Sequence, residues 1–120
     1  MATKEINEKV NPIILTDTET GDVYTLEFNR ESVRFAEARG FSIDDVARYP
    51  FTKLPELFWY SFRMHHMSVS KEKADRILFD MLGGMPEGMA ERLGALYGEP
   101  FKALTNEEQK PKNARMTVEF

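Results

Sequence analysis

The chain has 120 residues, a length that fits one domain and leaves little room for a second. Its composition, 42% hydrophobic and 30% charged, is ordinary for a globular protein, and no run approaches the roughly 18 apolar residues that a membrane span needs. The absence of cysteine excludes disulfides and thiolate sites, and a net charge of −4 without a basic cluster argues against general binding to phosphate backbones. Because the polar start of the chain lacks the apolar stretch of a secretory signal, we expect a cytoplasmic protein.

The first part of the chain predicts a β-hairpin over about residues 10–28. Ile13 and Ile14 begin a β-branched run, the segment 19–22 is rich in turn residues, and residues 23–28 alternate in polarity as a half-buried strand does. We therefore expect two antiparallel strands ahead of the helical part.

Two short helices are predicted after the hairpin. Asn29 suits an N-cap, with Phe28 and Val33 placed to form a hydrophobic staple around it, and Gly40 is expected to end this helix. Ser42 and Asp45 resemble a capping box for a second helix that ends near residues 48–50.

The stretch 51–67 is too apolar for a surface helix, and we expect it to be the central helix of the core. Thr52 is the expected N-cap, with Pro55 in the first turn. Two amphipathic helices should flank it, one over 71–82 capped by Ser70, and one that begins at Pro86 and continues towards residue 104.

These patterns predict an α+β fold that is mainly α, with an N-terminal β-hairpin and about five short helices. Residues 1–104 form a single globular domain, and residues 105–120 are expected to be a mobile tail that ends in a short strand or in a segment that orders against a partner. The predicted core consists of Leu57, Phe58, Phe62, Ile77, Leu78, Met81, Leu93 and Leu96.

The sequence offers little for catalysis, and we expect no enzyme, no cofactor and no metal site. His65 and His66 are adjacent, so on a helix they point about 100° apart and cannot grip one ion as an i, i+4 pair would. A structural role for both is the favoured interpretation. The paired carboxylates at 44–45 and 107–108 suit a helix N-terminus and a solvated tail.

Several apolar residues lie outside the helical stripes and are candidates for a protein interface. Phe35 and Phe79 each lie well off the apolar face of their predicted helix. Trp59 belongs to the aromatic-rich central helix. Apolar and polar residues alternate over positions 116–120 at the end of the chain. The predicted interface residues are Phe35, Trp59, Phe79, Met116, Val118 and Phe120.

Four segments together resemble a known family: Leu26–Val33, Glu37–Phe41, Leu54–His66 and Leu93–Tyr97. Their spacing is similar to that of the tail assembly chaperones of long-tailed, siphovirus-type bacteriophages and prophages of Gram-positive bacteria. The resemblance implies a non-enzymatic cytoplasmic factor that binds the tape measure protein, helps to recruit tail tube subunits and is absent from the mature virion. We further expect it to work as a homo-oligomer.

The residues alone leave a second function open, a small helical regulatory or nucleic-acid-binding module. It is disfavoured because no Lys/Arg cluster is seen on any predicted helix.

Overall fold

A computed structural model of the chain describes residues 9–104, 116 and 119–120. Strands β1 (Ile13–Thr16) and β2 (Val23–Leu26) form an antiparallel hairpin. Helices α2 (Arg30–Ala38), α3 (Asp45–Arg48), α4 (Pro50–Tyr60), α5 (Lys71–Asp75) and α6 (Met89–Gly98) follow. A π-helix, η1 (Arg76–Met81), continues α5, and a 3-10 helix, η2 (Glu99–Ala103), continues α6. The predicted α+β fold, mainly α, is confirmed.

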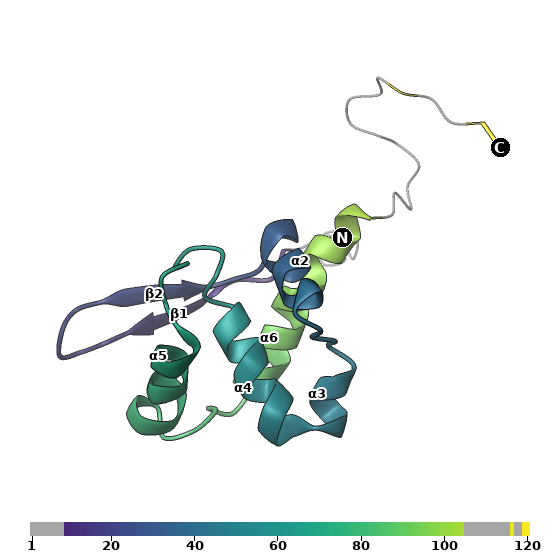
Figure 1. Ribbon diagram of the computed structural model, residues 1–120. Coiled ribbons are helices and arrows are strands. Elements are labelled where there is room, and N and C mark those ends of the chain that lie inside the picture. The colour runs from purple at the N-terminus through teal and green to yellow at the C-terminus, as the bar shows by residue number, and fades with distance from the viewer. Residues whose placement is uncertain (1–8, 105–115, 117–118) are drawn as a thin grey trace.

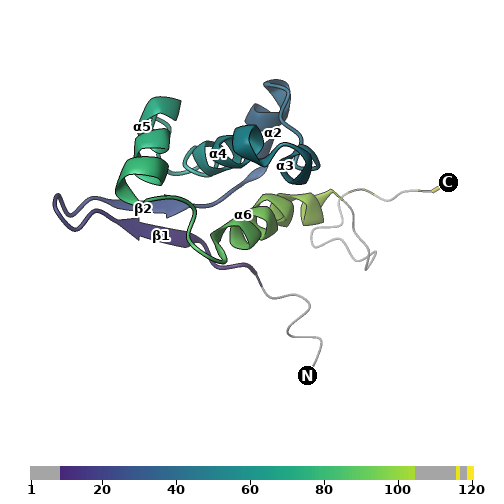
Figure 2. The same cartoon turned by 90° about the horizontal axis from the view of Figure 1, so that it is seen from below.

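Helix α4 is the centre of the helical part, because it contacts α2, α3, α5 and α6. The hairpin extends away from this group to one side, with α5 beside it (Figures 1 and 2). The aromatic stretch of the sequence therefore occupies the central position expected of it, with helices on several sides.

The hairpin is joined to the helices along one edge of β2. The backbone N–H of Thr25 donates to Nε2 of His66 at 2.9 Å, and the N–H of Glu27 donates to the carbonyl of Ser61 at 3.0 Å. Leu26 is fully buried between these two residues. The turns after α4 thus close this edge of the sheet and hold the hairpin against the core.

Helix α2 begins and ends as its sequence predicts. The side chain of Asn29 accepts from the N–H of Ser32 at 2.8 Å, and the Ser32 hydroxyl accepts from the N–H of Asn29 at 2.9 Å, which makes a reciprocal capping box. Phe28 and Val33, the expected staple, are both buried. Gly40 follows the C-cap with φ +90°, the left-handed conformation that glycine adopts without a steric cost.

Three predicted helix starts are wrong. Helix α3 has Asp44 as its N-cap without a side-chain hydrogen bond, so Ser42 and Asp45 form no capping box. Helix α4 starts at Pro50, whose fixed φ suits a first helical position, so Thr52 is not its N-cap and Pro55 lies inside the helix. Helix α6 starts at Met89 with Gly88 as its N-cap, so Pro86 is not its first helical residue.

The central helix is also shorter than predicted. It ends at Tyr60, and the chain continues through turns in which the N–H of Phe62 bonds to the carbonyl of Trp59 and the N–H of His66 bonds to that of Phe62. These turns place the side chains of Phe62 and His66 against Tyr24 of the hairpin, with ring centroids 5.7 and 5.3 Å apart. Contact with the sheet therefore replaces the last turns of the expected helix.

Seven of the eight predicted core residues are buried: Leu57, Phe58, Phe62, Ile77, Leu78, Leu93 and Leu96. Met81 is the exception, with 56% of its surface exposed. The π-helix explains this error, because its i→i+5 hydrogen bonds widen the turn and rotate the residues that follow away from the 3.6-residue stripe.

Candidate functional site

The first turns of α4 present an apolar face to solvent. Pro50, Phe51, Leu54 and Pro55 lie at i, i+1, i+4 and i+5, a spacing that places them on one side of a helix. Because the helix starts at Pro50, Phe51 stands at its outer end and is 97% exposed. Pro50 is exposed as well, whereas Leu54 is partly buried against the core and Pro55 is partly buried.

The opposite wall comes from η1 and the loop after it. Leu78 is buried and Phe79 is 55% exposed, although the two are neighbours in the sequence. Gly83 and Gly84 then adopt φ values of +73° and +116°, and the N–H of Gly84 bonds to the carbonyl of Leu78 at 2.8 Å. This left-handed turn reverses the chain and brings Met85 back beside Leu78 and Phe79.

Together these residues form an open hollow, which we call the apolar groove. It has a volume of about 270 Å³ and is lined by Pro50, Phe51, Leu54, Pro55, Leu78, Phe79 and Met85. All seven side chains are apolar. The groove is smaller than the roughly 300–1,000 Å³ of a typical small-molecule site and lacks the convergent polar groups that orient a substrate, so its chemistry suits apolar side chains of another polypeptide.

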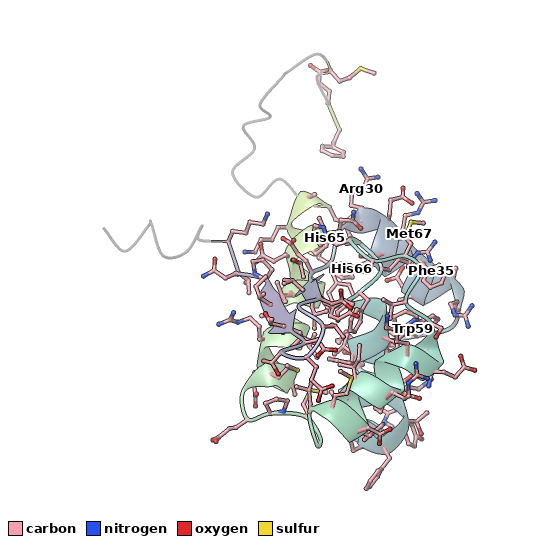
Figure 3. All side chains as sticks on the ribbon, turned by 90° about the vertical axis from the view of Figure 1, so that its left-hand side faces the viewer. Arg30, Phe35, Trp59, His65, His66 and Met67 are labelled. Carbon is pink, nitrogen blue, oxygen red and sulfur yellow. The ribbon has the colours of Figure 1, made fainter. Side chains whose placement is uncertain are left out.

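Phe35 and Trp59, two predicted interface residues, do not line the groove and lie together with Met67 near them (Figure 3). Their ring centroids are 6.1 Å apart, and the guanidinium of Arg63 lies over the Phe35 ring at 3.7 Å. The indole N–H of Trp59 donates to the carbonyl of Val69 at 3.0 Å. Both rings are half-buried and have partners within the chain, and their participation in an interface stays a prediction.

Phe79 is the predicted interface residue that lines the apolar groove. In the C-terminal segment, Met116 and Phe120 are highly exposed, whereas Val118 lies outside the described residues, as does most of the segment 105–120. The predicted tail and its strand are therefore not described by the structure. No described contact brings Phe79 together with Phe35 or Trp59.

Both histidines lie within hydrogen-bonding distance of groups in the hairpin segment, and His65 is exposed. Nε2 of His65 lies 2.9 Å from a carboxylate oxygen of Glu27, which also pairs with Nζ of Lys9 at 3.6 Å. His66 accepts the N–H of Thr25 as described above. Burial, with a smaller contribution from the neighbouring His65, lowers the pKa of His66 below its usual value of 6.5.

A second perturbed group lies in the core. Burial, followed by the nearby Glu37 and Tyr60, raises the pKa of Tyr97 to about 12, so its phenol stays neutral at physiological pH. Neither Tyr97 nor His66 lines the apolar groove. In the part of the chain that the structure describes, no group of three or more His, Cys, Asp or Glu side chains is placed to hold a metal ion.

The sequence interpretation missed most of the groove. Phe51, expected to pack within the helical core, is exposed, whereas Leu54 does pack against the core while it also lines the groove. Pro50 was expected to terminate the preceding helix. The available signal was Tyr49-Pro50-Phe51 itself, since proline at a first helical position starts the helix there and puts the next residue at its exposed end. The position of Met85 in the groove depends on the Gly83-Gly84 turn, and no apolar periodicity in the sequence indicates it.

None of the helices in the described ranges is both long and apolar enough to cross a lipid bilayer.

Comparison with known proteins gives a family but no relative of known role. No curated protein matches the chain, and no solved structure does. A family described as "Domain of unknown function (DUF5055)" matches residues 1–120, so the chain belongs to this family.

Proposed function

We propose that this protein is a tail assembly chaperone of a long-tailed bacteriophage or prophage, a non-enzymatic cytoplasmic factor that binds apolar segments of the tape measure protein. It also helps to recruit tail tube subunits and leaves before the virion is complete. The apolar groove holds the client. The proposal rests on the resemblance of four sequence segments to such chaperones and on the chemistry of this groove.

The observation that carries the proposal is an uncovered apolar surface on both walls of the groove. Phe51 is 97% exposed and Phe79 is 55% exposed, while Leu78 forms a buried floor between the walls. An apolar client helix could place its side chains against these rings as in helix-in-groove recognition. Met85 on the rim is unbranched and adapts to differently shaped side chains, which suits a helper that binds several segments of one long chain.

The first experiment is co-expression of the full chain with the tape measure protein encoded in the same gene cluster. We expect more soluble tape measure protein in the presence of the chain and a complex of the two in size-exclusion chromatography. Equal solubility with and without the chain, and no shared peak, would contradict the proposal. In the genome, the gene is expected between a tail tube gene and the long tape measure gene.

The groove is tested by serine substitutions at its rim. Fully burying one phenylalanine contributes about 1.5–3 kcal/mol, so Phe51→Ser and Phe79→Ser should each weaken client binding by roughly 10- to 150-fold in Kd. Met67→Ser and Leu104→Ser are matched controls, because these side chains are 68% and 70% exposed and lie outside the groove. Equal losses for groove and control variants would mean that the client binds elsewhere.

A further inference from the structure

The two edges of the hairpin differ. On β2, the N–H groups of Thr25 and Glu27 point away from β1 and are bonded to His66 and Ser61. At the turn, the N–H of Asp17 bonds to the carbonyl of Asp22 at 2.8 Å. Because hydrogen-bonded pairs alternate along an antiparallel ladder, Leu15 with Tyr24 and Ile13 with Leu26 are the bonded pairs within the hairpin.

It follows that Ile14 and Thr16 of β1 direct their backbone groups outward. Among the described residues, no hydrogen bond reaches the N–H of either one. Natural edge strands are usually protected by a charged residue, a proline or a bulge, but β1 reads Ile-Ile-Leu-Thr and has only Pro12 ahead of it. Within residues 9–104, one edge of the sheet is thus closed by the turns after α4, and the other, which we call the open edge, has no hydrogen-bonded partner strand.

A hollow of mixed character lies beside the open edge. Its apolar lining includes Ile14, Leu15, Met81 and Leu82, and its acidic lining consists of Asp17, Glu19 and Asp80. Ile14 and Met81 are each 56% exposed, and Leu82 is partly exposed. A strand added at this edge would therefore gain side-chain contacts in addition to backbone hydrogen bonds.

We propose that β1 pairs antiparallel with β1 of a second copy of this chain, across a two-fold axis, to form a continuous sheet of both hairpins. A strand edge is self-complementary, since the same residues supply donors and acceptors. With the two Ile14 residues opposite each other, they exchange both backbone hydrogen bonds. Each Thr16 N–H then reaches the carbonyl of Pro12 in the other copy.

Charge favours a second copy in this orientation. The hairpin turn carries Asp17, Glu19 and Asp22, whereas Lys9, which pairs with Glu27 of its own chain but stays 74% exposed, lies at the other end of β1. Antiparallel pairing places the Lys9 end of one copy towards the acidic turn of the other, and a parallel arrangement would bring the two acidic turns together. This inference is independent of client binding, because the apolar groove shares no residue with the β1 edge.

Proline substitutions in the full chain test the pairing. Ile14→Pro removes an outward N–H from the open edge and spares the bonds within the hairpin. Val23→Pro is the matched control, because Val23 faces Thr16 in the same kind of pair but its N–H lies on the β2 edge. Sedimentation velocity over a concentration series should show a dimer for the wild type and for Val23→Pro, and a monomer for Ile14→Pro. The helical circular dichroism signal of both variants should equal that of the wild type, which shows that the helices are still folded.

Cysteine cross-linking adds a readout that does not depend on proline. The chain has no cysteine, and Ile14 and Val23 are 56% and 52% exposed on the same face of the hairpin. Opposed Ile14 Cα atoms would lie about 5.5 Å apart, within the range that disulfides span. Ile14→Cys should therefore form a covalent dimer on mild oxidation at least ten times faster than Val23→Cys.

Three results would overturn the proposal, and a fourth observation would reassign the edge if the first of them occurs. The first is a wild type that stays monomeric throughout the series, and the second is equal cross-linking of the two cysteine variants. A dimer that survives Ile14→Pro but disappears when residues 115–120 are deleted would assign the contact to the C-terminal segment. A monomeric wild type whose tape measure binding is abolished by Ile14→Pro would assign this edge to the client. Loss of client binding in Phe51→Ser with an intact dimer would bear only on the groove.

Discussion

Replacing His66 with leucine should loosen the attachment of the hairpin to the helices. The substitution removes the acceptor for the N–H of Thr25, which lies 2.9 Å from Nε2 and is partly buried. Leaving a donor of this kind unsatisfied costs about 1–3 kcal/mol. His66→Gln is the matched variant, because the glutamine carbonyl can reach the position of Nε2 and accept the same hydrogen bond.

The same residue makes stability depend on pH with a defined sign. The pKa of His66 is lowered in the folded protein, chiefly by burial, so the unfolded chain binds this proton more readily. The stabilising contribution is complete above the unfolded pKa of 6.5 and is lost as the pH falls through the lower folded value. Since one proton is involved, the loss is at most about 1.4 kcal/mol per pH unit.

Urea unfolding followed by Trp59 fluorescence measures both effects. At pH 8 the order of stability should be wild type, His66→Gln and His66→Leu. Between pH 7 and 5 the wild type should lose more stability than His66→Gln, which does not titrate there, so that the difference between the two profiles isolates this histidine. Parallel profiles, or a His66→Leu variant as stable as the wild type, would refute the role given to the Thr25–His66 hydrogen bond.

Urea unfolding also tests three other features: the packing of the core, the cap of α2 and the hydrogen bond made by Trp59. Leu93→Ala should cost about 2–5 kcal/mol because Leu93 is fully buried, whereas Leu104→Ala, at a 70% exposed position, should change stability by less than about 0.5 kcal/mol. Asn29→Ala should cost about 1 kcal/mol through loss of the cap on α2, and Asn29→Ser should restore most of it; equal losses would mean that the cap is unimportant. Trp59→Phe should cost about 1 kcal/mol by removing the N–H that donates to Val69, and no loss would place that hydrogen bond among the dispensable contacts. Because Trp59 is the single tryptophan of the chain, urea unfolding of this variant and of its wild-type reference is followed by circular dichroism.

The sequence determined several features that depend on near neighbours in the chain, although the same kind of signal failed at the starts of α3, α4 and α6. The Asn29 cap, the Gly40 end of α2 and the Ser70 cap of α5 were all predicted correctly, because capping needs only residues within one turn. The hairpin and seven of the eight core residues also followed, since apolar periodicity reports which face of an element is buried. The candidate Phe79 was found because it breaks that periodicity.

Only the tertiary structure decided the end of the central helix, the exposure of Met81 and the shape of the apolar groove. Phe62 and His66 leave the helical path because contacts with Tyr24 and Thr25, about forty residues earlier, replace the last helical turns. Met81 is exposed because η1 is a π-helix, whose extra residue per turn has no periodic signature. The apolar groove is lined by residues of α4 and by Leu78, Phe79 and Met85, and the Gly83-Gly84 turn directs Met85 back towards α4. Contact between segments this far apart in the sequence depends on the packing of the whole chain.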